Sequence, residues 1–251
     1  IRLLSGRVPS LLIESSFGRA FPRFYIRGLG NTDFDLNASQ PVSLIYDDVV
    51  QENPILKGFP VFDLEMVEVF RGPQGTLFGR NTPAGVVKFN SVRPSREMGG
   101  YFQASYGEDA TVNLEGAVGG PLGKNWSMRL SAMYQHRDDW VDNYEPDGDL
   151  IEKNAFEGYD EAAGRLQFLY EPSEDFSALI NIHARTLDGT ARMFRANVFE
   201  LGSQGLVSGF DEDVVSYDGS NDQDLDSSGG SLRISKNFGN VTLHTITGYE
   251  T

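Results

Sequence analysis

The pattern of hydrophobic and polar residues changes near residue 96. Before that point, short apolar runs such as Met66–Phe70 alternate irregularly with turn residues. After it, apolar and polar residues alternate over long stretches, as in Trp126–Tyr134. Period-2 alternation is typical of strands with one apolar face. The pattern therefore predicts a small mixed α/β domain over residues 1–96, followed by antiparallel strands over residues 97–251.

The first region carries its expected elements close together. The apolar runs predict four short strands, at residues 24–26, 42–50, 66–70 and 85–90. Residues 62–65 suggest one helical turn, and the glycine-rich segment 71–81 predicts tight turns without a regular element. That segment lacks the Gly-Lys-Ser/Thr ending of a phosphate-binding loop. Structural turns are the better interpretation of these glycines.

The second region has strands and connections of a membrane barrel. Most alternating runs last about nine to eleven residues, the length that crosses a bilayer at a tilt. Aromatic residues recur near strand ends, as expected where a lipid-facing surface meets water. Short turns (residues 119–125, 171–175 and 238–240) alternate with long loops (residues 138–159 and 187–229). A soluble β-sandwich has shorter strands and no such bias, so we predict a mainly β protein with part of a transmembrane β-barrel.

Composition narrows the possible functions. The net charge is −15, from 36 acidic and 21 basic residues, and there is no cysteine. An acidic chain is a poor nucleic-acid binder, and thiolate metal sites and disulfides are excluded. No apolar run has the length of a membrane helix, and no catalytic spacing is present. The chain begins without a secretion signal and ends within a strand-like run, so we expect it to be part of a longer protein.

Side-chain parity predicts what the strands expose. In Trp126–Tyr134, even positions should face lipid and odd positions the barrel interior. Arginine at Leu130 should then cost roughly 2–4 kcal/mol, and at Ser131 much less. The charged or polar side chains expected inside the barrel are Arg129, Arg165, His183 and Arg185.

One acidic segment invites a calcium interpretation. Asp222, Asp224 and Asp226 have the spacing that opens a calcium-binding EF-hand loop, but Ser227 and Arg233 stand where that motif needs glycine and glutamate. An acidic surface loop is the better interpretation. The three histidines are far apart in sequence and form no metal-ligand pair. We therefore expect no metal site.

Three motifs carry a resemblance to a known family. They are Tyr25-Ile26-Arg27-Gly28-Leu29-Gly30, the run Leu44–Asp48 and the run Val67–Asn81, which contains Arg-Gly-Pro-Gln-Gly-Thr-Leu. These residues resemble the plug domain of TonB-dependent outer-membrane receptors of Gram-negative bacteria. The resemblance implies a barrel of about 22 strands filled by the plug, of which about seven strands lie in this chain. It also implies active uptake driven by the inner-membrane TonB complex, without a cofactor.

The resemblance further assigns roles to residues. It implies that Arg27 and Arg71 anchor the plug to glutamates of the barrel wall. It also implies that plug loops contact cargo, with candidates Asn31, Thr32, Asp33, Phe34, Gln51, Glu52 and Asn53. The expected partners are the TonB complex, outer-membrane lipid and a small-molecule cargo such as a ferric siderophore. Cobalamin, haem or oligosaccharide cargo remains open, as do two other classes, a passive porin and a barrel-borne hydrolase.

Overall fold

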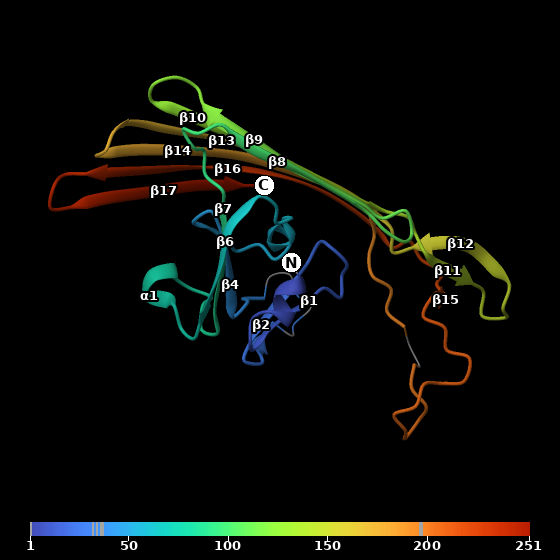
Figure 1. Cartoon of the computed structure of the whole chain (residues 1–251). Coiled ribbons are helices and arrows are strands. Elements are labelled where there is room, and N and C mark those ends of the chain that lie inside the picture. The colour runs from blue at the N-terminus through green and yellow to red at the C-terminus, as the bar shows by residue number, and fades with distance from the viewer. Residues whose placement is uncertain (1, 32, 34, 36–37, 196–197) are drawn as a thin grey trace.

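The computed structural model describes residues 2–31, 33, 35, 38–195 and 198–251. Within them the chain is mostly β-strand, arranged in one long sheet and three smaller sheets. Figure 1 shows the long sheet as an arch, with the N-terminal elements packed on its inner side. We call the long sheet the wall and residues 2–91 the inner unit. No helix in the described part of the chain is long and apolar enough to cross a membrane.

The wall consists of seven antiparallel strands in the order β17-β16-β14-β13-β10-β9-β8. They are β8 (Gly99–Tyr106), β9 (Val112–Pro121), β10 (Trp126–Arg137), β13 (Tyr159–Ser173), β14 (Phe176–Thr190), β16 (Asp222–Asn237) and β17 (Thr242–Glu250). Short turns join strands at one end, and at the other end long connections join β10 to β13 and β14 to β16 (Figure 1). β8 and β17 are the two edges, so the sheet is an open part of a barrel, as the sequence predicts.

Side chains of β10 alternate between two environments. Ser127, Ser131 and Met133 are buried, whereas Leu130 is 45% exposed. β13 and β14 show the same alternation, with odd positions such as Arg165 buried. Because successive side chains of a strand point to opposite faces, one face of the wall meets the inner unit and the other points away. The alternation follows side-chain parity, and contact of the exposed face with lipid stays a prediction.

Two small sheets build the inner unit. One contains β1 (Leu11–Glu14), β2 (Arg23–Ile26) and β3 (Leu29–Gly30), and the other has the order β5-β4-β7-β6. The strands of this second sheet are β5 (Val49–Gln51), β4 (Val42–Tyr46), β7 (Gly85–Ser91) and β6 (Leu64–Arg71), with β4 and β7 parallel. Their apolar side chains form one core, which includes Phe24, Ile26, Val42, Leu44, Val87 and Phe89. Short 3₁₀ turns lie at Arg2–Gly6 (η1) and Leu56–Gly58 (η2).

Three local predictions for the inner unit are corrected. Residues 62–65 form no helical turn, because Asp63 has a left-handed backbone (φ 49°) and β6 starts at Leu64. The predicted strand 42–50 is a hairpin that turns at Asp47 and Asp48, both with positive φ. The glycine-rich segment contains one helical turn, α1 (Gly75–Phe78).

The long connections also contain more structure than the sequence predicts. β11 (Val141–Tyr144), β12 (Leu150–Phe156) and β15 (Val214–Val215) form a third small sheet, which packs around Val141, Phe156, Met193 and Val215. The wall strands also extend further than expected, since β14 ends at Thr190 and β16 begins at Asp222.

The acidic segment therefore lies in a strand, and its interpretation as a loop is wrong. Asp222, Asp224 and Asp226 occupy alternate positions of β16 and are all exposed. Strand geometry holds them in a row along one face, where a calcium loop would wrap them around an ion. In the described part of the chain, no group of three or more acidic or histidine side chains is placed to hold a metal ion.

Candidate functional site

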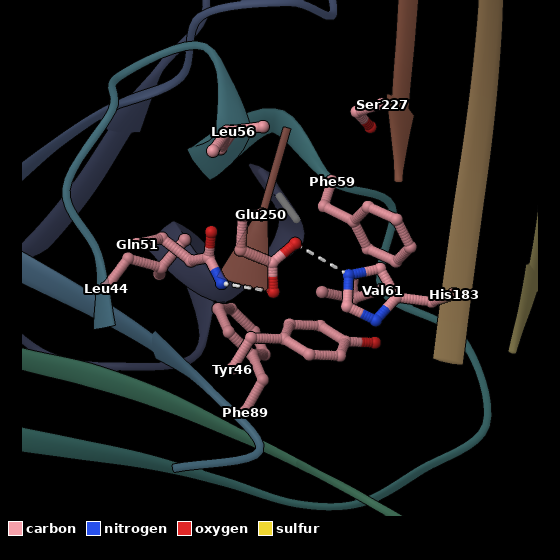
Figure 2. A pocket seen from close by; sticks show the side chains of 10 residues that line it. All are labelled: Leu44, Tyr46, Gln51, Leu56, Phe59, Val61, Phe89, His183, Ser227 and Glu250. Carbon is pink, nitrogen blue, oxygen red and sulfur yellow. Dashed lines mark hydrogen bonds and ion pairs between the residues drawn. The ribbon is translucent and has the colours of Figure 1, made fainter. Parts of the chain in front are cut away.

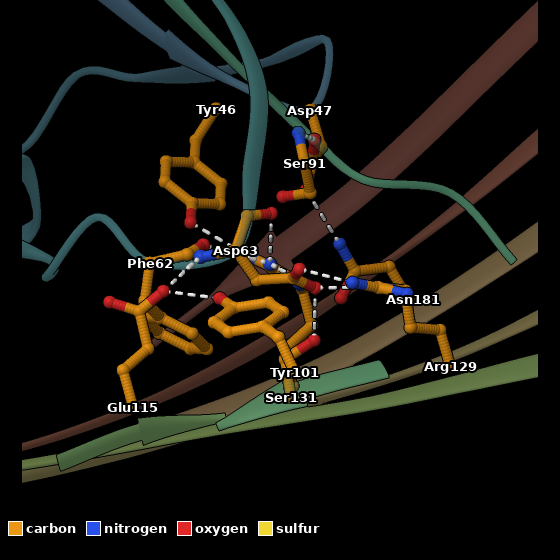
Figure 3. A network of polar contacts seen from close by, with 11 residues as sticks. Tyr46, Asp47, Phe62, Asp63, Ser91, Tyr101, Glu115, Arg129, Ser131 and Asn181 are labelled. Carbon is orange, nitrogen blue, oxygen red and sulfur yellow. Dashed lines mark hydrogen bonds and ion pairs between the residues drawn. The ribbon is translucent and has the colours of Figure 1, made fainter. Parts of the chain in front are cut away.

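Asp63 is the centre of a polar network between the inner unit and the wall (Figure 3). Its carboxylate accepts hydrogen bonds from Arg129 Nε (2.7 Å) and from the hydroxyl of Ser131. Arg165 lies 3.6 Å from the same carboxylate and also donates to the backbone carbonyl of Phe62 at 3.0 Å. Asp63 can reach these groups because its left-handed backbone turns the chain just before β6. We call these contacts the Asp63 network.

Burial and charge oppose each other at Asp63. Burial alone would raise the pKa of Asp63, but hydrogen bonds from Arg129 and Ser131 and the charge of both arginines hold it below its usual value. Asp63 is 4% exposed and Arg165 is 1% exposed. A buried ion pair of this kind adds little net stability, yet leaving one partner unpaired is strongly destabilising. The network therefore specifies how the inner unit is seated on the wall.

A second group of contacts surrounds the hairpin turn of β4 and β5. Asp47 accepts a hydrogen bond from Asn181 Nδ2 of β14 at 3.0 Å and another from Ser91 at 2.6 Å. Asp48 pairs with Lys88 at 2.6 Å and with Arg233 of β16. Burial raises the pKa of Asp48, but Lys88 and Arg233 outweigh burial and lower it. This turn is thus a further polar contact with the wall.

A small pocket lies where β14 and β17 meet the inner unit (Figure 2). His183 Nε2 and a carboxylate oxygen of Glu250 are 2.8 Å apart, and the ring of Phe59 packs edge-on against His183 at 4.9 Å. Gln51 Nε2 donates to Glu250 at 3.5 Å. Gly229 of β16 lies between His183 and Glu250 in the sheet, and a Cβ at Gly229 would lie 2.0 Å from Glu250 Oε2. The glycine therefore makes the His183–Glu250 contact possible.

A larger cleft of about 460 Å³ separates the inner unit from the wall at the end with the long connections. Its lining includes Arg19, Arg137, Arg192, Glu157, Glu161 and Tyr159. Arg19 lies in the segment between β1 and β2 and is 2.5 Å from Glu161 of β13. A mixed-charge, partly aromatic cleft of this size can hold a small polar molecule.

The structure places all four expected interior side chains on the face of the wall that meets the inner unit. Arg129 and Arg165 belong to the Asp63 network, and His183 lines the small pocket. Arg185 is buried and bonds Glu161 at 2.8 Å. Parity located these residues, but it did not reveal their partners in the inner unit.

Arg27 and Arg71 are both exposed. Arg71 pairs in register with Gly85 across β6 and β7. A Cβ at Gly85 would lie 2.9 Å from Ile26 Cδ1, so the two arginine segments are neighbours. Their anchoring role stays a prediction.

The loop residues expected to contact cargo lie in different surroundings. Thr32 and Phe34 are outside the described residues. Asn31 is buried, and its side-chain oxygen accepts a hydrogen bond from the amide of the exposed Asp33. Gln51 lines the small pocket, as described above. None of the five described candidates lines the larger cleft.

Glu52 and Asn53 complete this set. Glu52 accepts a hydrogen bond from Arg80 at 3.0 Å, and that bond lowers the pKa of Glu52. Asn53 accepts a hydrogen bond from the amide of Ile55 at 3.0 Å. Cargo contact by these loops also stays a prediction.

Sequence reasoning missed Asp63 and Arg19. Buried arginines in a wall require acceptors, and this requirement could have prompted a search for a carboxylate in the first region. No local pattern marks Asp63 among the other acidic residues. Arg19 lies between Phe17 and Phe21 without any motif.

An inner unit seated on the polar face of an open barrel wall defines a class of membrane protein, the plugged outer-membrane barrel. Residues 2–86 match the family model of the TonB-dependent receptor plug domain. Residues 2–86, which lie in the inner unit, are thus similar to a domain of the TonB-dependent receptors, which are outer-membrane proteins of Gram-negative bacteria.

Individual relatives agree with this family. The chain is 26% identical to the pesticin receptor of Yersinia pestis over 115 residues, which is 46% of this chain and 17% of that protein. It is 36% identical to the ferrioxamine B receptor of Salmonella typhimurium over 77 residues, which is 30% of this chain and 11% of that protein. The crystal structure of the ferric yersiniabactin uptake receptor of Yersinia pestis matches 97% of the chain with a TM-score of 0.78 at 18% identity. The chain spans 36% of that structure.

Proposed function

We propose that the chain is part of a TonB-dependent transporter that takes up a ferric siderophore across the outer membrane. Residues 1–96 would be the plug domain and residues 97–251 the N-terminal part of the barrel. The observation that carries this proposal is the cleft between the inner unit and the wall, which lies at the end with the long connections. In outer-membrane barrels the long loops are extracellular, so cargo would enter the cleft from outside.

The names of the relatives favour an iron chelate as cargo. One relative is a ferrioxamine B receptor, and another similar protein is a ferric yersiniabactin uptake receptor. The partners we propose are the TonB complex, which would supply energy from the inner membrane, and the surrounding outer-membrane lipid. Transport, with no chemical change of the cargo, is the activity that this arrangement supports.

Uptake of radioactive iron tests the proposal. The full-length protein would be expressed in a bacterium without its own siderophore receptors and supplied with labelled ferric chelates, ferrioxamine B among them. We expect accumulation that requires TonB and stops when the proton-motive force is collapsed. Accumulation that continues without TonB would indicate a passive pore, and liposome swelling by small sugars would confirm that alternative.

We also propose that Arg27 and Arg71 anchor the plug to wall strands opposite those described. Both side chains are exposed here and belong to neighbouring segments. Replacing both with alanine in the full-length protein should raise passive permeability to antibiotics that the intact barrel excludes. Unchanged permeability, together with unchanged hydrogen exchange in β2 and β6, would count against anchoring.

A further inference from the structure

Arg19 holds an unusual position at the edge of the cleft. Its guanidinium pairs with Glu161 at 2.5 Å and donates a hydrogen bond to the side chain of Gln135. It also lies over the ring of Tyr159, 4.1 Å from the ring centroid. The Arg19 side chain remains 32% exposed, whereas that of Glu161 is 2% exposed. Arg19 can therefore turn toward the cleft and still be hydrated.

Glu161 does not depend on Arg19 alone. Arg185 of β14 bonds the other carboxylate oxygen of Glu161, with Nε at 2.8 Å, and is itself buried. A buried charge left without any partner is costly. Because Arg185 stays in place, departure of Arg19 leaves Glu161 paired. This arrangement permits Arg19 to change partners at low cost.

The cleft also offers hydrogen-bond donors that have no acceptor. Buried Nε of Arg137 and buried Nε1 of Trp140 have no hydrogen-bond partner among the described residues. Both residues line the cleft. Buried polar groups in proteins are nearly always satisfied, so two such donors at one site favour a ligand rich in acceptor oxygens.

The backbone holds Arg19 at this place. Gln223 Nε2 of β16 donates to the carbonyl of Phe17 at 2.6 Å. Gly18 has a positive φ of 74°, and a Cβ there would lie 3.0 Å from the side chain of Gln223. The segment 15–22 is thus held to the wall by Gln223 of β16, by the side-chain contacts of Arg19, and by a 3.5 Å hydrogen bond from Arg185 of β14 to the backbone carbonyl of Arg19.

We propose that Arg19 is an exchangeable anion-recognition residue: an anionic, oxygen-rich ligand in the cleft takes Arg19 from Glu161, which keeps Arg185. This inference rests on the proposed function, because the ligand would be the cargo. Among ferric chelates, Arg19 would favour anionic ones, such as tris-catecholate complexes, over cationic ones such as ferrioxamine B. Exchange of Arg19 also removes its side-chain contacts with Glu161 and Gln135, which help to hold segment 15–22 to the wall.

Binding measurements with two probes test the selectivity. The full-length protein would be titrated with an anionic ferric tris-catecholate and with cationic ferrioxamine B. Arg19→Gln should weaken binding of the catecholate about tenfold or more, since a charge-assisted hydrogen bond is lost. The catecholate affinity of Arg19→Lys should lie between those of the wild type and Arg19→Gln, because lysine keeps the charge but lacks the planar guanidinium. Arg7→Gln, at an exposed arginine that does not line the cleft, is the matched control and should change neither affinity.

Glu161→Gln separates exchange from a merely structural ion pair. The glutamine still accepts a hydrogen bond from Arg185 but no longer competes for Arg19. Catecholate binding should therefore become tighter, because the binding-competent state is more populated. If Arg19→Gln and Glu161→Gln both weaken binding, the pair is structural and the proposal falls while the proposed function stands.

Hydrogen exchange of the protein in the absence of both ferric chelates gives the second measurement. Amides of residues 15–22 should exchange faster in Glu161→Gln than in the wild-type protein, and citrate should speed exchange in the wild type but not in Arg19→Gln. Unchanged exchange in both comparisons would overturn the proposal. If these amides respond as expected but neither chelate binds, the proposed siderophore function is wrong and the anion-recognition site remains.

Discussion

Removing the charge of Asp63 should loosen the inner unit from the wall. Asp63→Asn keeps the side-chain shape but takes the negative charge away from Arg129 and Arg165, and Arg165 is 1% exposed. Breaking a buried ion pair by removing one partner costs about 3–5 kcal/mol. We expect the lower end, about 3 kcal/mol, because the amide oxygen still accepts one hydrogen bond and the carbonyl of Phe62 still binds Arg165.

Native-state hydrogen exchange of the β6 amides measures this loss. About 3 kcal/mol corresponds to a roughly hundredfold faster exchange, when exchange reports the opening equilibrium. Glu65→Gln, at an exposed position of the same strand, is the matched control and should change exchange little. Combining Asp63→Asn with Arg129→Gln should cost less than the two single changes added together. Exchange in Asp63→Asn that stays within about threefold of wild type would refute the reasoning.

The same contact should depend on pH. The pKa of Asp63 is lower in the folded protein than its ordinary value. A carboxyl whose pKa is lowered by folding stabilises the fold above its unfolded pKa, about 4, and this stabilisation is lost as the pH falls through the folded value. Protection of β6 should therefore decrease on acidification below about pH 4 in the wild type. It should decrease less in Asp63→Asn.

Three further predictions concern other parts of the chain. Burial lowers the pKa of Lys57 to about 8, so between about pH 8 and pH 10 the unfolded state binds more protons than the folded state, and stability should rise with pH there. Denaturation measured over this pH range should show no such rise in Lys57→Met, and an equal rise in the variant and the wild type would contradict the prediction. Leu130→Arg should destabilise the protein folded in lipid vesicles by roughly 2–4 kcal/mol, whereas Leu130→Met should be nearly neutral. Equal stability of the two variants would contradict exposure of Leu130 to lipid. Gly229→Ala should separate His183 from Glu250, because its Cβ would lie 2.0 Å from the carboxylate; a crystal structure of the variant with that contact intact would disprove the steric argument.

Parity along the wall strands could be predicted because it is local. Each side chain of a strand points opposite to its neighbours, so the pattern alone placed Arg129, Arg165, His183 and Arg185 on one face. The contents of that face were not predictable, because they depend on distant partners. Arg129 and Asp63 are 66 residues apart, and Arg19 and Glu161 are 142 residues apart.

Ser131 illustrates this limit. Parity predicted that arginine there would be much milder than at Leu130, since barrel interiors are polar. The structure changes this expectation, because Ser131 is 1% exposed and donates a hydrogen bond to Asp63. A larger side chain at this position would disrupt the Asp63 network. The face of the sheet to which a side chain points follows from the sequence, whereas the space around that side chain does not.

The wall contacts of Asp47, Asp48 and Asp63 have a consequence for assembly. Their described wall partners lie on β10, β13, β14 and β16, which all follow the inner unit in the chain. The seat of the β5-β4-β7-β6 sheet is therefore made within one continuous stretch of sequence. Such a stretch holds both partners of each of these contacts, so the inner unit can be seated on these strands without any other part of a barrel. In the complete barrel that we propose, the remaining strands would close around an inner unit already in place, and no folded domain would have to be threaded through a finished ring.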